Sequence, residues 1–179
     1  KYLANAWKDE YIRKIRETTN ITLIADNNIK THDEANQMLE DNLVDLVGIG
    51  RPLLSDPAWV SKGQSGNPIA PCISCSHCFK SINEFKAVEC PINPYLSRES
   101  LEKPKYNPAN ADKTMVVIGA GPAGCELALN LSAKGYNVVV FEKEDRIGAK
   151  LNMAVHLPGK ARINQYVKYL ENRILNSDI

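Results

Sequence analysis

The sequence predicts an α/β fold in which helices cover parallel strands, in two segments on either side of a cysteine-rich stretch. Three observations support this prediction. Short apolar, β-branched runs alternate with helical periodicities in residues 1–63 and again in residues 114–179. A glycine-rich turn joins the first strand and the first helix of the second segment. Four of the five cysteines lie between Pro71 and Pro91.

The first segment predicts a strand–helix–strand–helix order after an opening helix. Thr31, with Glu34 three residues later, has the spacing of a capping box and predicts a helix start. The short links between the elements predict that the two strands are parallel. The expected elements are a helix over 1–20, a strand over 21–26, a helix from Thr31 to residue 41, a strand over 44–50, and a loop with a short helix over 51–63.

The second segment predicts another strand–helix–strand order, reached through stretches without periodicity. Residues 64–71 have the composition of a linker, and residues 93–113, rich in Pro and Asn, predict an extended surface connection. The expected elements that follow are a strand over 114–119, a helix over 122–134, a strand over 136–142 and a late helix over 161–175.

The turn between the strand over 114–119 and the next helix has the Gly-x-Gly-x-x-Gly pattern of dinucleotide-binding domains. Gly119 would permit the tight turn, Gly121 would let a pyrophosphate approach the backbone, and Gly124 would let the helix pack closely on the strand. Pro122 and Ala123 complete the loop, and the helix N-terminus offers free amides to phosphate. The alternative is a strand–turn–helix that binds no ligand.

Glu142 ends the second strand of this unit, where its carboxylate could accept both hydroxyls of an adenosine ribose. The alternative is a solvated strand end. "GPAG" followed by "FEKEDRIGAKL" looks like the FAD-binding half of flavoproteins with two dinucleotide domains, so FAD is favoured over NAD. Lys143 and Lys150 are further candidate contacts. Such flavoproteins have a second Gly and a frequent Gln where this chain has Ala149 and Lys150.

The cysteine spacing favours an iron–sulfur site over zinc, disulfides or free thiols. Cys72, Cys75 and Cys78 are each separated by two residues, and Cys90 follows after eleven more, directly before a proline. Three thiols in one tight loop suit a 4Fe–4S cluster, in which each thiolate binds a separate iron. Structural zinc sites usually have two separated pairs of ligands. Cys125 is expected to be a small buried residue.

Composition excludes several partners. The formal net charge is +1, from 22 basic and 21 acidic residues, so no strong field attracts nucleic acid or an anionic membrane. The sequence has no apolar run of about 18 residues, the length at which a membrane helix is indicated. Clustered cysteines beside a nucleotide motif favour a reducing, cytoplasmic setting.

These motifs, in this order, resemble the NADH:flavin oxidoreductase family that includes 2,4-dienoyl-CoA reductase, enoate reductase and trimethylamine dehydrogenase. "VDLVGIGRPLLSDPAWVSKG" is similar to the end of the family's FMN-carrying barrel. "PCISCSHCF" with "ECPINP" is similar to its cluster loop, and "VVIGAGPAG", "FEK" and "RIGAKLN" are similar to its FAD domain. The resemblance implies three parts: the end of a TIM barrel over 1–66, a 4Fe–4S linker over 67–112, and the start of a Rossmann-like FAD domain over 113–179.

The resemblance also implies where FMN phosphate would bind, because TIM barrels commonly hold phosphate with the loops after strands seven and eight. Gly50 would offer a backbone amide and Arg51 a charged partner. At the other loop, the family usually has a Gly-Gly pair where this chain has Asn27 and Asn28. Asparagine tolerates left-handed backbone angles, so the turn is expected to survive. Asp26, however, would place negative charge near the phosphate.

For activity, the resemblance implies an NAD(P)H-dependent enzyme that passes electrons through FAD and the cluster to FMN, which reduces an activated C=C bond of an enoyl-CoA or enoate. The alternatives are an amine dehydrogenase of the same architecture and a non-enzymatic, zinc-stabilised nucleotide-binding module. A full barrel needs eight strands, so the chain is expected to be an internal part of a longer enzyme and inactive alone. No catalytic residue is assigned within it.

Overall fold

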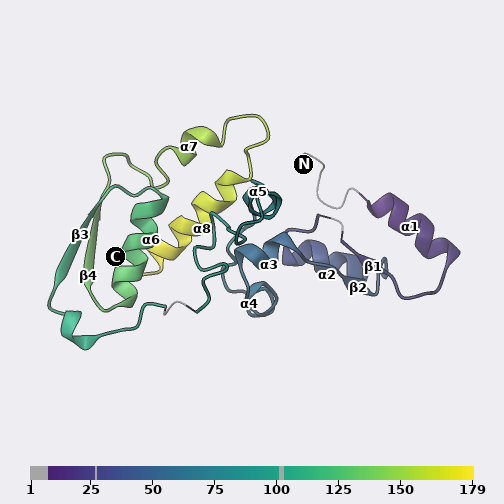
Figure 1. Ribbon diagram of the computed structural model, residues 1–179, viewed down its shortest axis with the longest axis horizontal. Helices are drawn as coiled ribbons and strands as arrows, with labels where there is room; N and C mark the ends of the chain where they lie inside the picture. The colour runs from purple at the N-terminus through teal and green to yellow at the C-terminus, as the bar shows by residue number, and fades with distance from the viewer. Residues whose placement is uncertain (1–7, 27, 101–102) are drawn as a thin grey trace. The chain divides into compact units, whose positions relative to one another are not determined.

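A computed structural model describes residues 8–26, 28–100 and 103–179 (Figure 1). The chain divides into two compact units, Lys1–Asn93 and Pro94–Ile179, and each is described by itself. The three-part division expected from the sequence stays a prediction. None of the described helices is both long and apolar enough to cross a membrane.

The first unit contains one pair of parallel strands, as predicted. β1 (Ile24–Ala25) pairs with β2 (Leu46–Val47), and the amide of Gly48 extends the ladder by donating to the carbonyl of Ala25. Both strands are shorter than expected, because within the described residues each has a single neighbour with which to form ladder hydrogen bonds. Of the helix expected over 1–20, α1 (Asp9–Thr18) is present, and residues 1–7 lie outside the described residues.

The helix α2 (His32–Glu40) begins where the sequence predicts. The Thr31 hydroxyl accepts a hydrogen bond from the amide of Glu34 at 3.2 Å, and the Glu34 carboxylate accepts one from the amide of Thr31 at 3.0 Å. This reciprocal arrangement is a capping box, which satisfies two of the free amides at a helix start. The capping-box prediction is therefore confirmed.

Two short helices follow β2 and anchor the cysteine stretch. α3 (Arg51–Ser55) and α4 (Trp59–Ser65) replace the predicted loop and short helix. Buried Asp56, between them, accepts hydrogen bonds from the amide of Ala70 at 2.9 Å and from Lys62 at 2.6 Å. At the other end of the stretch, the Asn93 amide group donates to the carbonyl of Leu54 at 3.0 Å. Both ends of the cysteine stretch are thus attached to the α3 region.

The core of the first unit lies between the strand pair and the helices α2 and α4. Its buried apolar residues come from β1, the loop after β1, α2, the turn before β2, and α4: Ala25, Ile29, Ala35, Met38, Leu43, Val44 and Trp59. Trp59 is 3% exposed, and its ring lies 5.4 Å from that of His32 at the start of α2. This packing holds the loops after both strands close to α3.

The second unit has the predicted strand–helix–strand order. β3 (Thr114–Ile118) pairs in parallel with β4 (Asn137–Phe141), and α6 (Pro122–Ala133) connects them. Figure 1 shows α6 beside the strand pair, with α8 (Ile163–Leu175) on the other side of α6. Val117, Val138 and Ala128 form the buried centre between strands and helix. The predictions for β3, α6, β4 and the late helix are confirmed.

Three short elements were not predicted. They are α5 (His77–Asn83) within the cysteine stretch, the 3₁₀ turn η1 (Pro108–Asn110) within the expected extended connection, and α7 (Leu151–Ala154) after β4. Elements of one or two turns bury few apolar side chains and therefore leave no clear hydrophobic period in the sequence.

Candidate cofactor sites

The four clustered cysteines line one cavity in the first unit. Cys72, Cys75, Cys78 and Cys90 border it together with Arg51 and several apolar residues, and all four are free thiols. Left-handed backbone at Ser74 (φ 55°) and Ser76 (φ 64°) turns the chain twice between the first three cysteines. The structure thus places all four candidate metal ligands on the lining of one cavity.

The donor chemistry of this cavity fits a thiolate-bound metal group. Four thiols are the ligand set of both a 4Fe–4S cluster and a four-cysteine zinc site. Within the part of the chain that the structure describes, no three His, Cys, Asp or Glu residues converge to hold a single metal ion. His77, between two of the cysteines, has its Nε2 3.3 Å from a carboxylate oxygen of Glu89.

Two of these thiols have environments that bear on their chemistry, one through burial and one through a neighbouring lysine. Burial raises the pKa of the Cys90 thiol, which disfavours its thiolate in the absence of a metal. Lys30 Nζ lies 3.9 Å from Cys72 Sγ and donates a hydrogen bond to it. Lys30 was not among the predicted residues. A signal for it was available, because it lies in the loop after the first strand, beside the predicted Asn27 and Asn28.

A second cavity in the first unit lies between the loops after β1 and β2, where FMN phosphate was expected. It has a volume of about 380 Å³, and the candidate residues Asn28, Gly50 and Arg51 line it. Arg51 Nη2 donates to Asn28 Oδ1 at 2.8 Å, so the structure joins the two predicted loops directly. Asn28 has φ 55°, the left-handed conformation anticipated for this turn. Asn27 lies outside the described residues.

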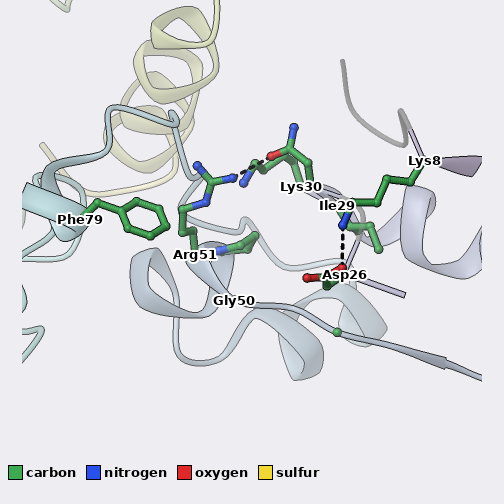
Figure 2. A pocket seen from close by; sticks show the side chains of 10 residues that line it. Lys8, Asp26, Ile29, Lys30, Gly50, Arg51 and Phe79 are labelled. Carbon is green, nitrogen blue, oxygen red and sulfur yellow. Dashed lines mark hydrogen bonds and ion pairs between the residues drawn. The ribbon is translucent and has the colours of Figure 1, made fainter. Parts of the chain in front are cut away.

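The charges around this cavity favour an anion despite Asp26. Figure 2 shows Lys8 against Asp26, with Nζ 2.9 Å from Oδ1. This ion pair lowers the pKa of Asp26 and partly neutralises its charge. Lys30 and Arg51 also line the cavity, and the Arg51 guanidinium lies 5.8 Å from the ring centre of Phe79. Three cations therefore face one carboxylate.

Three residues that were not predicted from the sequence also line this cavity: Lys8, Lys30 and Phe79. Lys8 precedes α1 by one position and Phe79 belongs to α5, so neither lies in a strand-end loop. No local motif marks them, because only packing of the first unit brings them to the cavity.

In the second unit, the glycine loop has the geometry that its pattern predicts. Gly119 has φ +96°, a backbone conformation that L side chains rarely adopt. A Cβ at Gly124 would lie 1.9 Å from the carbonyl oxygen of Gly119, so helix and strand approach too closely for any side chain there. Gly121 is the N-cap of α6 and Pro122 its first residue, followed by exposed Ala123.

Glu142 lies beside this loop and is held by backbone amides. Its carboxylate accepts hydrogen bonds from the amide of Ala120 at 2.7 Å, of Lys143 at 2.8 Å and of Glu144 at 3.1 Å. These donors, Ala120 first among them, lower the pKa of Glu142. The carboxylate is thus fixed and ionised next to the glycine loop, 22 residues away in sequence from Ala120.

The segment after Glu142 folds back on the glycine loop. The amide of Gly148 donates to the carbonyl of Ala120 at 2.9 Å, and a Cβ built on Gly121 would lie 3.5 Å from Cβ of Ala149. Ala149 has φ 46°, in the left-handed region that favours glycine. The side chain of Lys143 pairs with Glu144, and exposed Lys150 is the N-cap of α7.

Cys125, the fifth cysteine, is a small buried residue, as predicted. It is 1% exposed, and its Sγ lies 3.4 Å from the carbonyl oxygen of Ala120. Burial raises the pKa of its thiol, so it stays protonated and unreactive. It belongs to the second unit, whereas the four clustered cysteines belong to the first.

Both halves of this chain match known protein families. Residues 3–69 match the NADH:flavin oxidoreductase / NADH oxidase family, and residues 117–170 match the NAD(P)-binding Rossmann-like domain. A bilirubin reductase of Mediterraneibacter gnavus is 35% identical over 92% of this chain and 26% of its own length. The chain belongs to the NADH:flavin oxidoreductase / NADH oxidase family. The predicted resemblance is confirmed.

Two further known proteins match over a similar share of their length. An NADH oxidase of Thermoanaerobacter brockii is 30% identical over 97% of this chain and 27% of its own length. The solved structure of a histamine dehydrogenase from Rhizobium sp. 4-9 superimposes with a TM-score of 0.87 at 25% identity, over 97% of this chain and 26% of the other. The chain therefore spans about a quarter of these relatives, matching a barrel end and a Rossmann-like start.

Proposed function

We propose that this chain is the part of an iron–sulfur flavoprotein oxidoreductase whose first unit holds a 4Fe–4S cluster beside the FMN phosphate and whose second unit binds FAD. The observation that carries the proposal is the placement of Arg51, which lines both the cysteine cavity and the cavity of the expected FMN phosphate. When bound, the cofactors would pass electrons from NAD(P)H through FAD and a 4Fe–4S cluster to FMN, which reduces the substrate.

The four cysteines of the first unit would hold the cluster. Their x2, x2 spacing lets one loop supply three thiolates, and Cys90, which lines the same cavity, would supply the fourth. Attachment of both ends of the stretch, through Ala70 and Asn93, keeps this loop in place against α3. Zinc is the alternative occupant, and metal analysis separates the two.

The cavity between the β1 and β2 loops would bind the FMN phosphate. The Gly50 region supplies backbone, and Arg51 supplies a guanidinium that is already oriented by Asn28. Lys8 and Lys30 add positive charge at the same cavity. These residues would fix one end of the flavin next to the cysteine cavity.

The glycine loop of the second unit would bind FAD. Gly121 leaves room for the pyrophosphate at the start of α6, and Glu142 would accept the ribose hydroxyls. One Glu142 oxygen accepts a hydrogen bond from the amide of Ala120, which favours the ionised carboxylate. NAD is the alternative dinucleotide at this loop.

For the substrate, we propose an activated C=C bond of an enoyl-CoA or enoate, as in reductases of this family. The likeness to a reductase and to an NADH oxidase supports reduction with NAD(P)H. The likeness to a histamine dehydrogenase favours, as a second candidate, an amine dehydrogenase of the same architecture. No residue within this chain is assigned to substrate chemistry.

Metal and sulfide analysis tests the proposal. The chain is purified without oxygen, reconstituted with iron and sulfide, and assayed for iron, acid-labile sulfide and zinc. We expect about four irons and four sulfides per chain. Cys90→Ser should lose most of the iron, whereas the matched control Cys125→Ala, which changes the cysteine of the other unit, should keep it.

One zinc per chain without sulfide would overturn the iron–sulfur proposal and favour the non-enzymatic zinc module. Equal loss of iron in both cysteine variants would also contradict it, because Cys125 lies outside the cysteine cavity. Flavin content, measured separately by absorbance after reconstitution with FMN and FAD, tests the two nucleotide sites.

A further inference from the structure

Lys30 lines one cavity of the first unit and contacts a residue that lines the other. It lines the expected FMN phosphate cavity, and its Nζ lies 3.9 Å from Sγ of Cys72, which is 42 residues away in sequence. Figure 2 shows its side chain at the same cavity as that of Arg51. Neither the motifs nor the comparisons single out this lysine.

The backbone of Lys30 is firmly held. Its amide donates to Oε2 of Glu34 at 2.8 Å, and the same oxygen accepts the amide of Thr31 at 3.0 Å. The capping box of α2 therefore fixes the stem from which the lysine side chain extends. Arg51 also borders the cysteine cavity, but its guanidinium donates to Asn28 and lies over Phe79.

A cation at this position acts selectively on a bound cluster. Reduction adds one negative charge to the cluster and its thiolates, so a nearby ammonium stabilises the reduced form more than the oxidised form. An N–H donor to a ligand sulfur has the same sign of effect. Both effects raise the reduction potential.

We propose that Lys30 is a positioning residue that raises the reduction potential of the cluster through its contact with Cys72. The proposal rests on the proposed function, since it requires the four cysteines to hold a 4Fe–4S cluster. It assigns to one side chain both a place at the phosphate cavity and control of the neighbouring redox centre.

The test is a redox titration of the reconstituted chain, followed by electron paramagnetic resonance of the reduced cluster. At the wild-type midpoint potential, Lys30→Met should show about a tenfold higher ratio of oxidised to reduced cluster, equivalent to about 59 mV for a one-electron couple. Lys30→Arg, which keeps the charge and the N–H donor, should have a midpoint potential close to that of wild type. Lys14→Met, which removes an exposed lysine paired with Glu10, is the matched control and should leave the midpoint unchanged.

An unchanged midpoint in Lys30→Met, with full iron content, would overturn the inference while leaving the proposed function intact. Absence of iron from the wild-type chain would overturn the proposed function, and this inference with it. If the Met variant assembles no cluster, Lys30→Gln decides the question, because it removes the charge with a polar side chain. A wild-type midpoint in that variant would overturn the inference.

Discussion

The two units offer different kinds of contact to an anion. In the second unit the glycine loop offers backbone amides at the start of α6, whose first turn contains no charged side chain. In the first unit the cavity between the β1 and β2 loops is lined by the cations Lys8, Lys30 and Arg51. One site depends on the course of the main chain, and the other depends on side chains brought from separate elements.

This difference predicts how each site responds to substitution. A backbone site tolerates no added Cβ where the chain approaches itself, so a substitution at such a position should lower stability. A side-chain site can lose one cation and keep its fold, so its variants should lose affinity by degrees. The following predictions test this contrast, from the largest expected effect to the smallest.

Gly124→Ala should give the largest effect. A new Cβ would meet the Gly119 carbonyl oxygen at 1.9 Å, and backbone cannot move as a side-chain end can. We expect the second unit to lose about 2 kcal/mol in the free energy of unfolding, because overpacking outweighs the gain in helix propensity. Urea unfolding of the variant and of wild type measures this difference in the free energy of unfolding.

Gly121→Ala is the matched comparison, since its Cβ would meet only Cβ of Ala149, at the ordinary distance of 3.5 Å. It should unfold like wild type but bind FAD more weakly, because the pyrophosphate can no longer approach the backbone. Equal stabilities for the two variants would refute the steric argument for Gly124.

Arg51→Met should weaken binding in the first unit without unfolding it. Loss of a charge-assisted hydrogen bond to phosphate should raise the dissociation constant for FMN about tenfold to a hundredfold. Quenching of flavin fluorescence measures the affinity. Arg51→Lys keeps the charge but loses the planar guanidinium, so its dissociation constant for FMN should lie between those of wild type and Arg51→Met. Wild-type affinity in Arg51→Met would show that phosphate does not bind there.

Ala149→Gly should stabilise the second unit. Relief of left-handed strain at φ 46° exceeds the extra conformational entropy that glycine loses on folding, so we expect a gain of about 0.5–1 kcal/mol. The midpoint of urea unfolding should rise. A lower midpoint would mean that the Ala149 methyl group contributes packing that outweighs the strain.

Glu142 should give the smallest effect, visible only as a pH dependence. The amide donors lower the pKa of Glu142 below its ordinary value of 4.5. The ionised carboxylate therefore stabilises the fold fully above about pH 4.5. This contribution is lost as the pH falls through the pKa of the folded state. The stability advantage of wild type over Glu142→Gln should therefore shrink as pH falls below about 4.5, in unfolding curves measured from pH 7 to pH 3.5. A constant difference over this range would contradict the prediction.

Features encoded by neighbouring residues were the ones that the sequence analysis located well. The capping box of Thr31, the turn at Gly119 and the left-handed Asn28 depend on contacts within a few residues. β3, α6 and β4 carry strong apolar patterns and agree with prediction within about two residues. β1 and β2 were overestimated, because strand length depends on neighbouring strands as well as on the apolar run.

The sequence by itself determined the family, the cysteine set and the glycine loop, because each is a pattern of residue types at fixed spacing. Only the tertiary structure decided which side chains contact one another at these sites. Lys8 reaches Asp26 across 18 residues, Arg51 reaches Asn28 across 23, and Lys30 reaches Cys72 across 42. Such contacts follow from the packing of helices on the strand pair, and no period or motif in the sequence pairs these partners with each other.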